Sequence, residues 1–331
     1  MEPDLGEFEL IRRFFIRRGP VRRGVRVGIG DDAAVLELPR GVDLVASVDT
    51  IVAGRHFLED ADPRMIGHRA LAVNLSDMAA MGATPAWATL ALTMPGADPV
   101  WLENFAAGFL DLADAHAVAL VGGDTTRGPL TVSVQILGSV PHGSAMRRGG
   151  GQAGDILAVS GTLGDAGAGL AFVKSPPAAA SSDVEALIQR FNYPTPRVQL
   201  GLAARGIATA AMDLSDGLVG DLPKLAQASG LAARVAVDAL PLSGAMRNAA
   251  SLSQARDWAL AGGDDYELLL AVPPSRFTEL QGAADQLNLT LTPIGELHAG
   301  EGVTWSLNGK EFAPSVSGYD HFAQASTQIT V

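Results

Sequence analysis

The sequence predicts a mixed α/β (α+β) protein with two domains, and three observations support this fold class. The chain has 331 residues, of which 47% are hydrophobic, and this is enough to bury two cores of ordinary domain size. Short runs rich in β-branched residues alternate with alanine-rich stretches of helical period, which is typical of mixed sheets flanked by helices. A glycine- and arginine-rich segment without periodicity, residues 141–154, separates two such halves.

We therefore expect domains over residues 1–142 and 143–331. In the first domain, the apolar patterns predict strands at 43–48, 86–94 and 130–140 and helices at 65–81 and 101–115. In the second domain, they predict strands at 156–160, 233–237 and 266–272, helices at 163–173, 197–205 and 218–228, and a solvent loop at 174–182.

Composition excludes several classes of function. A formal charge of −12 argues against a nucleic-acid partner, which would require a concentrated basic surface. The chain has no cysteine, which excludes disulfides, thiolate metal sites and a cysteine nucleophile. No apolar run is long enough to span a membrane, and the arginine-rich stretch at 12–26 follows acidic residues that a targeting peptide would lack. We expect a cytoplasmic protein, with that stretch forming a solvated helix face.

Five short motifs place aspartate beside glycine or serine: GIGDD at 28–32, NLSD at 74–77, GGDTT at 122–126, DLSDG at 213–217 and GGDDY at 262–266. Carboxylate oxygens are ligands that Mg²⁺ prefers, and glycine lets a backbone approach phosphate oxygens closely. The combination therefore predicts a site for magnesium and a nucleotide.

The chain lacks the usual lysine-based phosphate motifs. It contains no Walker A loop, and its three lysines lie outside the glycine-rich motifs. Phosphate charge would then be neutralised by metal ions and arginine, for which Arg148 is the candidate because its planar fork matches phosphate. The aspartates available for more than one ion are Asp32, Asp49, Asp77, Asp124, Asp213 and Asp216.

Each motif also has a structural explanation. Gly-Asp-Asp and Gly-Gly-Asp are common in turns, where glycine adopts positive φ. Asp49 ends the predicted strand, where it could cap a helix or bind a ligand at the carboxyl end of the strand. Asp77 interrupts an apolar helix, which favours a functional role. The joint occurrence of all five motifs favours function.

The two halves of the chain share short sequences. Leu-Ser-Asp occurs at 75–77 and 214–216, and Gly-Gly-Asp at 122–124 and 262–264. Gly-Gly-Asp therefore begins 47 residues after Leu-Ser-Asp in the first half and 48 residues after it in the second. This spacing indicates either a pseudo-symmetric repeat or a chance echo of short motifs. Aspartates from both halves predict an active site at the domain or subunit interface.

Together with DTIVAGRHF at 49–57 and GYDHF at 318–322, these motifs resemble the thiamine-monophosphate kinase family over residues 6–322. The resemblance implies the two-domain fold of aminoimidazole ribonucleotide synthetase and a homodimer formed through the N-terminal domains. It also implies an ATP-dependent phosphorylation of thiamine monophosphate to thiamine diphosphate.

The resemblance further implies roles for individual residues. The magnesium ligands would be Asp32, Ser47, Val48, Asp49, Asp77, Asp124, Asp213 and Asp216. ATP would contact Gly123, Asp124, Arg148 and Ser215, and thiamine monophosphate would contact His56, Asp264 and Val316. Two positions depart from the family pattern. Val48 lacks a hydroxyl, so only its backbone could bind metal, and Val316 lacks the aromatic ring that many relatives place beside the substrate.

The chemistry of the acceptor agrees with this reaction. A phosphate monoester with a second pKa of about 6 is largely ionised at neutral pH, so no general base is needed. This favours direct in-line transfer assisted by several Mg²⁺ ions over a phosphorylated enzyme. We interpret His321 as structural.

Three other members of the wider superfamily and one non-enzymatic function are alternatives. Aminoimidazole ribonucleotide synthetase is disfavoured by the segment around His56 and by the GYDHF ending. Selenophosphate synthetase and the hydrogenase-maturation member typically depend on cysteine, which this chain lacks. A non-catalytic sensor of nucleotide or thiamine phosphate would bind both ligands without turnover.

Overall fold

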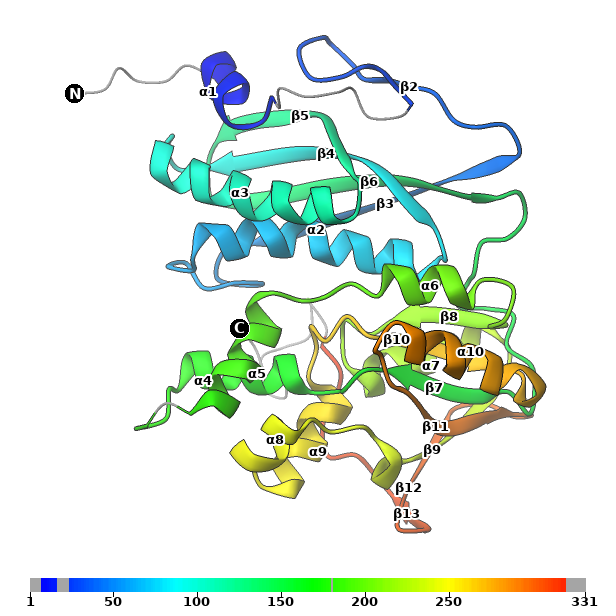
Figure 1. Cartoon of the computed structure of the whole chain (residues 1–331). Helices are drawn as coiled ribbons and strands as arrows, with labels where there is room; N and C mark the ends of the chain where they lie inside the picture. Colours follow the sequence, from blue (N-terminus) through cyan, green and yellow to red (C-terminus); the bar gives the residue numbers. More distant parts are fainter. Residues whose placement is uncertain (1–6, 17–23, 180, 320–331) are drawn as a thin grey trace. The chain divides into compact units, whose positions relative to one another are not determined.

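The computed structural model describes residues 7–16, 24–179 and 181–319 (Figure 1). These residues form two compact units, and each is described by itself. The first unit contains the described residues up to 78 together with 84–143, and the second contains 79–83 and 144–319. None of the helices in the described ranges combines the length and the apolar character that a membrane crossing requires.

The first unit is built on a four-stranded sheet in the order β3-β6-β4-β5. The strands are β3 (Val42–Val52), β4 (Thr84–Met94), β5 (Ala119–Arg127) and β6 (Thr131–Pro141). β4 and β5 are parallel, and the other neighbours are antiparallel. The remaining elements are α1 (Glu7–Phe14), α2 (Pro63–Ala80), α3 (Pro99–Ala115), and a small hairpin of β1 (Val25–Val27) and β2 (Val35–Leu36).

Helices α2 and α3 cover one face of this sheet (Figure 1). They pack closely because two glycines lie at their contact. A Cβ atom at Gly67 would lie 2.1 Å from the Phe105 carbonyl oxygen, and one at Gly108 would lie 1.9 Å from the Arg64 carbonyl oxygen. No larger side chain fits at either position without moving a helix backbone.

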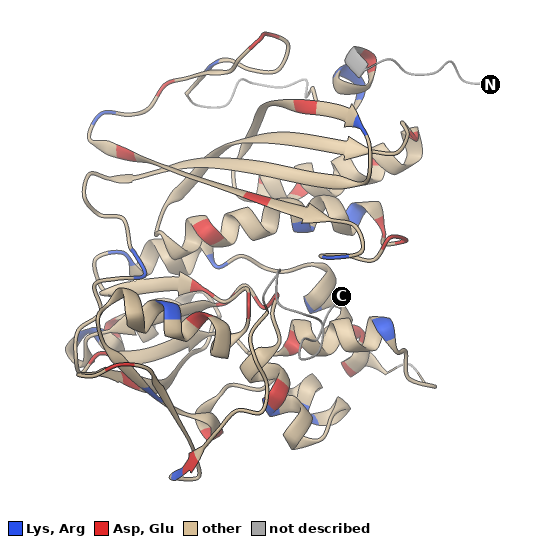
Figure 2. Cartoon of the chain, turned by 180° about the vertical axis from the view of Figure 1, so that it is seen from behind, with Lys and Arg blue, Asp and Glu red and all other residues tan. Residues whose placement is uncertain are grey.

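The other face of the four-stranded sheet carries no helix from the described part of the first unit, as the view from behind shows (Figure 2). Leu44 and Val48 of β3 are 51% and 62% exposed on this face. Thr50 and Ser133 hydrogen-bond to each other there at 2.7 Å between their hydroxyl oxygens. One face is thus a helix-covered core and the other is an open surface with apolar side chains.

The second unit is built on a seven-stranded sheet in the order β13-β12-β9-β11-β7-β10-β8. Its strands are β7 (Ile156–Ser160), β8 (Ala210–Asp213), β9 (Ala232–Ala236), β10 (Leu268–Val272), β11 (Leu291–His298), β12 (Val303–Leu307) and β13 (Lys310–Phe312). β9 and β12 are parallel, and the other paired neighbours are antiparallel.

Seven α-helices accompany this sheet within the described range: α4 (Asp165–Lys174), α5 (Ser182–Asn192), α6 (Val198–Ala204), α7 (Leu218–Ala228), α8 (Gly244–Ala249), α9 (Leu252–Ala261) and α10 (Pro274–Gln286). The 3-10 turn η1 (Val237–Ala239) follows β9. The apolar side chains of β7, β8, β10 and α7 form a continuous buried core. The predicted mixed α/β architecture is confirmed in both units.

Two local expectations are wrong. Asp49 does not end a strand, because β3 continues to Val52 and pairs with β6 over eleven consecutive positions. Gly123 and Asp124 lie within β5 and not in a turn. The solvent loop predicted at 174–182 is confirmed in the described residues between α4, which ends at Lys174, and α5, which begins at Ser182.

The repeated tripeptides have different local structures in the two halves. Leu-Ser-Asp at 75–77 lies inside α2, whereas the same tripeptide at 214–216 lies in the connection between β8 and α7. Gly-Gly-Asp at 122–124 is part of β5, and at 262–264 it follows α9. The repeated tripeptides therefore do not mark a structural repeat at these positions.

Candidate active site

Ser47, Asp49, Asn74 and Asp77 are joined by hydrogen bonds between β3 and α2, and we call them the Ser47–Asp77 group. The Ser47 hydroxyl donates to Asp77 Oδ2, and the backbone N–H of Asp49 donates to Asn74 Oδ1 at 3.2 Å. Asn74 Nδ2 donates to the Ala70 carbonyl at 3.0 Å, which orients the amide. Strand alternation places residues 47 and 49 on one face, and helical spacing places residues 74 and 77 opposite them.

The electrostatics of this group favour a cation. Burial raises the pKa of Asp49 to about 6, and the like charge of Asp77 adds to the rise. A bound cation would relieve this repulsion. Mg²⁺ is usually held by one or two carboxylates, with the rest of its shell supplied by water and phosphate. The oxygen donors of the Ser47–Asp77 group therefore fit Mg²⁺ shared with a phosphorylated ligand.

Other candidates in the first unit lie apart from this group. The Val48 side chain points to the open face of the sheet, opposite to Ser47 and Asp49, so only its backbone could join them. Asp32 lies on an exposed loop between β1 and β2, where its N–H donates to the Asp31 carboxylate at 2.8 Å.

Gly123 and Asp124 lie on β5, at the opposite edge of the sheet from β3. At the usual strand spacing, three intervals separate β5 from Asp49 by roughly 14 Å. Gly123 has φ of 150°, and a Cβ atom there would lie 1.8 Å from the Leu90 carbonyl oxygen. The glycine is thus required by the contact with β4 as well as being a candidate for nucleotide binding.

No three carboxylate or histidine side chains gather into a complete metal cage anywhere in residues 7–16, 24–179 and 181–319. In the first unit, the predicted ligands form one group at β3 and two separate positions, Asp32 and Asp124.

His56 lies in the tight turn that follows β3. The ring atom Nδ1 accepts the backbone N–H of Val52 at 3.1 Å. The backbone N–H of His56 donates to the Val52 carbonyl at 3.0 Å. Because Nδ1 accepts, the ring is in the tautomer with its proton on Nε2. A hydrogen-bond donor at Nε2 suits contact with a phosphate oxygen.

In the second unit, three separate motifs meet. The N–H of Asp264 donates to the Ser215 carbonyl at 2.9 Å, and the N–H of Tyr319 donates to the Asp216 carbonyl at 3.1 Å. A Cβ atom at Gly318 would lie 2.5 Å from Gly220 Cα, so the last described segment packs directly against α7. The structure therefore brings together the segments 213–217, 262–266 and 316–319.

The loop at 213–217 is held by a buried carboxylate. Asp221 Oδ2 accepts the N–H groups of Ser215 and Asp216 at 3.0 and 2.9 Å. Lys224 donates to Asp216 Oδ2 at 2.6 Å and to Asp221 Oδ1 at 2.9 Å. Burial alone would lower the pKa of Lys224, but these hydrogen bonds outweigh burial and raise it. Asp213 is the last residue of β8 and is 5% exposed.

The remaining candidates differ in their surroundings. Arg148 is exposed, and its carbonyl accepts the Ser229 hydroxyl at 3.3 Å. Val316 is partly buried and packs against the main apolar core of the second unit. His321 lies outside the described residues, as do Phe322 and the arginines at 17, 18, 22 and 23.

Sequence reasoning missed several polar residues at these motifs. Asp221 and Lys224 were not identified, although their spacing from Asp216 along the chain could have suggested a cap for the loop. Glu267 was noted only as part of its motif, and its arginine partners lie about 70 residues away. A single sequence gives no signal for such distant partners.

Comparison with known proteins agrees with the motifs. Models of the AIR synthase related protein family match residues 30–140 with the N-terminal domain and residues 152–307 with the C-terminal domain. Thiamine-monophosphate kinase of Salmonella typhimurium is 48% identical over 320 residues, which cover 96% of this chain and 98% of the relative. The chain belongs to the thiamine-monophosphate kinase family.

Solved members of the thiamine-monophosphate kinase family share the fold. The crystal structure of the enzyme from Stenotrophomonas maltophilia K279a is 47% identical, covers 87% of this chain and 92% of that one, and has a TM-score of 0.82. AaThiL, solved in complex with AMPPCP and TMP, is 33% identical, with a TM-score of 0.77 and coverage of 89% and 92%. The predicted two-domain fold is thereby confirmed.

Proposed function

We propose that the chain phosphorylates thiamine monophosphate with ATP to form thiamine diphosphate and ADP. The observation that carries the proposal is the half-buried pair of Asp49 and Asp77, in which the pKa of Asp49 is raised to about 6. Such a pair favours a cation that phosphates can share. The proposed reaction is that of the thiamine-monophosphate kinase that matches 96% of the chain. A second relative has been solved in complex with AMPPCP, an ATP analogue, and TMP.

Individual roles follow from chemistry and resemblance together. Asp49, Asp77 and Ser47 offer oxygen ligands to Mg²⁺, with the Val48 backbone beside them, and Asp32, Asp124, Asp213 and Asp216 extend the proposed set to several ions. Gly123, Asp124, Arg148 and Ser215 contact ATP in this proposal, and His56, Asp264 and Val316 contact thiamine monophosphate.

Bound Mg²⁺ would supply charge neutralisation for the two anionic reactants. The residues of the chain orient them. His56, with its proton on Nε2, donates to an acceptor oxygen, and the Arg148 guanidinium binds phosphate oxygens. The Asp221 carboxylate keeps the segment of Ser215 and Asp216 in one conformation through their N–H groups. The acceptor oxygen is already ionised, so transfer proceeds in line without a base.

The proposal includes a homodimer and a cytoplasmic location. The open face of the four-stranded sheet exposes Leu44 and Val48, and a second copy of this face would bury them. A cytoplasmic location fits a reaction that consumes ATP. Cell fractionation followed by immunodetection of the chain tests the location.

A coupled assay for ADP with thiamine monophosphate, thiamine and aminoimidazole precursors tests the proposed reaction. We expect turnover with thiamine monophosphate only, because thiamine presents a hydroxyl that would need a base. Turnover with a formylglycinamidine-type precursor would favour the synthetase reaction instead. Exchange of label between ADP and ATP without acceptor would contradict in-line transfer, since it requires a phosphorylated enzyme.

A further inference from the structure

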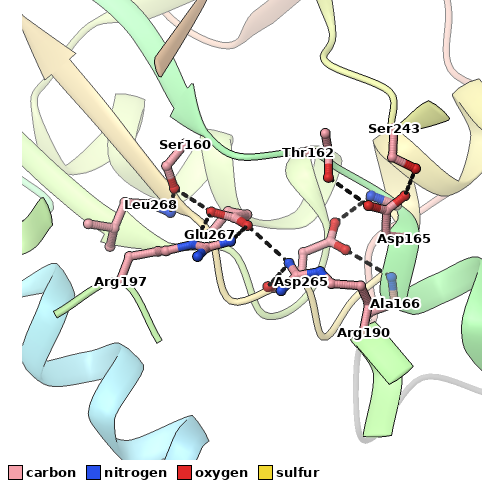
Figure 3. Close-up of polar contacts among 11 residues, drawn as sticks. Ser160, Thr162, Asp165, Ala166, Arg190, Arg197, Ser243, Asp265, Glu267 and Leu268 are labelled. Carbon is pink, nitrogen blue, oxygen red and sulfur yellow. Dashed lines mark hydrogen bonds and ion pairs between the residues drawn. The ribbon is translucent and has the colours of Figure 1, made fainter. Parts of the chain in front are cut away.

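Glu267 is a carboxylate buried completely within the second unit, immediately before β10 (Figure 3). Arg197 donates to both carboxylate oxygens, from Nε to Oε2 at 2.7 Å and from its terminal nitrogen to Oε1. Arg190 donates to Oε1 at 3.0 Å, and the Ser160 hydroxyl donates to Oε2 at 2.6 Å. We call these four residues the Glu267 clamp.

A buried ion cluster is a poor device for stability alone. Desolvation of the charges offsets much of their attraction, and apolar side chains of similar volume often stabilise a core as well. The clamp does, however, join parts of the chain that are distant in sequence. Arg190 belongs to α5, Arg197 directly precedes α6, and Glu267 directly precedes β10. A role in positioning a neighbouring segment is therefore the better explanation.

The segment beside the clamp is the motif at 262–266. Arg190 donates to the backbone carbonyl of Asp265 at 3.3 Å as well as to Glu267. The Asp265 side chain accepts the N–H groups of Gly164 and Ala166, at 2.5 and 3.1 Å, where α4 begins (Figure 3). The side chains of Asp265 and Glu267 are thus both anchored in the interior of the unit.

Asp264 and Tyr266 alternate with these anchors and have a strained backbone. Their φ values are 69° and 50°, in the left-handed region that a bulky residue such as tyrosine rarely adopts. Their N–H groups donate to the carbonyls of Ser215 and Leu214, each at 2.9 Å. The Tyr266 hydroxyl donates to Asp264 Oδ1 at 3.1 Å. Such a conformation persists only where the surroundings hold it.

We propose that the Glu267 clamp holds this turn so that the Asp264 carboxylate is fixed for thiamine monophosphate. The inference rests on the proposed function, in which Asp264 contacts that substrate. Thiamine monophosphate carries a cationic thiazolium ring and an amino group, and a fixed carboxylate attracts the first and accepts from the second. Glu267, Arg190 and Arg197 are positioning residues, because they act through Asp264.

The test begins with Arg190→Met. Arg197 and Ser160 still bind Glu267 in this variant, and the Arg190 side chain is 22% exposed, so the fold should survive. We expect the KM for thiamine monophosphate to rise about tenfold, with kcat and the KM for ATP changed by less than about threefold. Arg190→Lys keeps the charge and should restore much of the loss. Glu267→Gln should show the same split with a larger effect.

The matched control is Arg234→Met, which removes an exposed ion pair with Glu296 in the same unit and should change neither KM. Calorimetric binding of thiamine monophosphate without ATP and melting temperatures are measured for every variant.

No turnover by the wild type would reject the proposed function. An active wild type with an unchanged KM for thiamine monophosphate in folded Arg190→Met and Glu267→Gln would reject the clamp alone. Equal rises in both KM values, or unfolding of both variants, would show a purely structural cluster and also reject it.

Discussion

Asp49 and Asp77 share a half-buried place between a strand and a helix, where the charge of Asp77 makes the ionisation of Asp49 less favourable. Burial is the larger cause of the raised pKa of Asp49, and the charge of Asp77 is the second. The Ser47 hydroxyl donates to Asp77 and Asn74 Oδ1 accepts the backbone N–H of Asp49, and these two hydrogen bonds fix the geometry of the pair. The arrangement is poorly suited to stability and well suited to a cation, and this is the reason for the proposed metal binding there.

Asp77→Asn should lower kcat/KM by at least about 100-fold, because it removes charge that the developing phosphate charge requires. The melting temperature should change by less than about 2 °C, since the amide keeps the shape and relieves repulsion with Asp49. The pKa of Asp49 should fall, which NMR titration can follow. Asp111→Asn, which removes an exposed ion pair with Arg64, is the control for activity. Loss of stability in proportion to loss of activity would contradict a metal-binding role.

Asp265 makes a pH-dependent contribution to stability. Burial raises its pKa to about 8, although hydrogen bonds from Gly164 and Ala166 and the charge of Arg190 oppose the rise. The folded state then keeps a proton between about pH 4 and 8 that the unfolded chain releases, so the free energy of unfolding from this group falls as pH rises through that window.

Asp265→Asn should remove this dependence. The slope of unfolding free energy against pH should become less negative by up to about 1.4 kcal/mol per pH unit between pH 5 and 7. Urea denaturation at several pH values measures the slope, which is more informative than the absolute stability because asparagine also loses one backbone contact. An unchanged slope would mean that the carboxylate is ionised in the folded protein.

At the scale of elements, helix α2 depends on close contact with α3. A methyl group at Gly67 would lie 2.1 Å from the Phe105 carbonyl oxygen, so the helices would have to separate. Gly67→Ala should therefore destabilise the protein by about 3 kcal/mol or more, and activity should fall with it because α2 carries Asp77. Denaturant unfolding measures the change.

Gly282→Ala is the matched control within helix α10. No heavy atom lies within 4 Å of a Cβ atom there, so alanine should stabilise the protein by about 0.4–1 kcal/mol through its better helix propensity. Similar effects at both glycines would show that the α2–α3 contact is not tight.

Several elements could be predicted from the sequence and others could not. The apolar run at 156–160 and the helically spaced leucines of the segment at 218–228 correspond to β7 and α7, because their burial follows directly from local pattern. β5 was missed because its glycines and aspartate read as a turn, whereas pairing with β4 keeps them extended. The end of β3 was misplaced because pairing with β6 extends the strand past Asp49.

Some features of the candidate site could likewise be predicted from the sequence, and others could not. Asp77 could be singled out because serine and aspartate are unusual in the middle of an apolar helix, and the structure joins it to Ser47. The left-handed turn at Asp264 and its Glu267 clamp could not be predicted, because backbone strain and partners about 70 residues away leave no local pattern. The motifs could be identified from their residues and spacing, but their geometry depends on tertiary packing.

At the scale of the whole molecule, the proposed homodimer would form through the open sheet face of the first unit. Leu44→Asp should convert a dimer to a monomer, because it buries a charge in the proposed contact between two copies. Light scattering after size exclusion measures the mass. Leu252→Asp, at a residue of the second unit with the same 51% exposure, should leave the mass unchanged. A monomeric wild type at micromolar concentration would contradict the dimer.

Assay of the reaction itself tests the proposed function most directly. The purified chain is incubated with ATP and thiamine monophosphate, with and without Mg²⁺, and thiamine diphosphate and ADP are separated and quantified. We predict one thiamine diphosphate for each ADP, only when a divalent cation is present, and almost none with Asp77→Asn. Binding of both ligands without either product would contradict the proposed kinase function and identify the chain as a sensor.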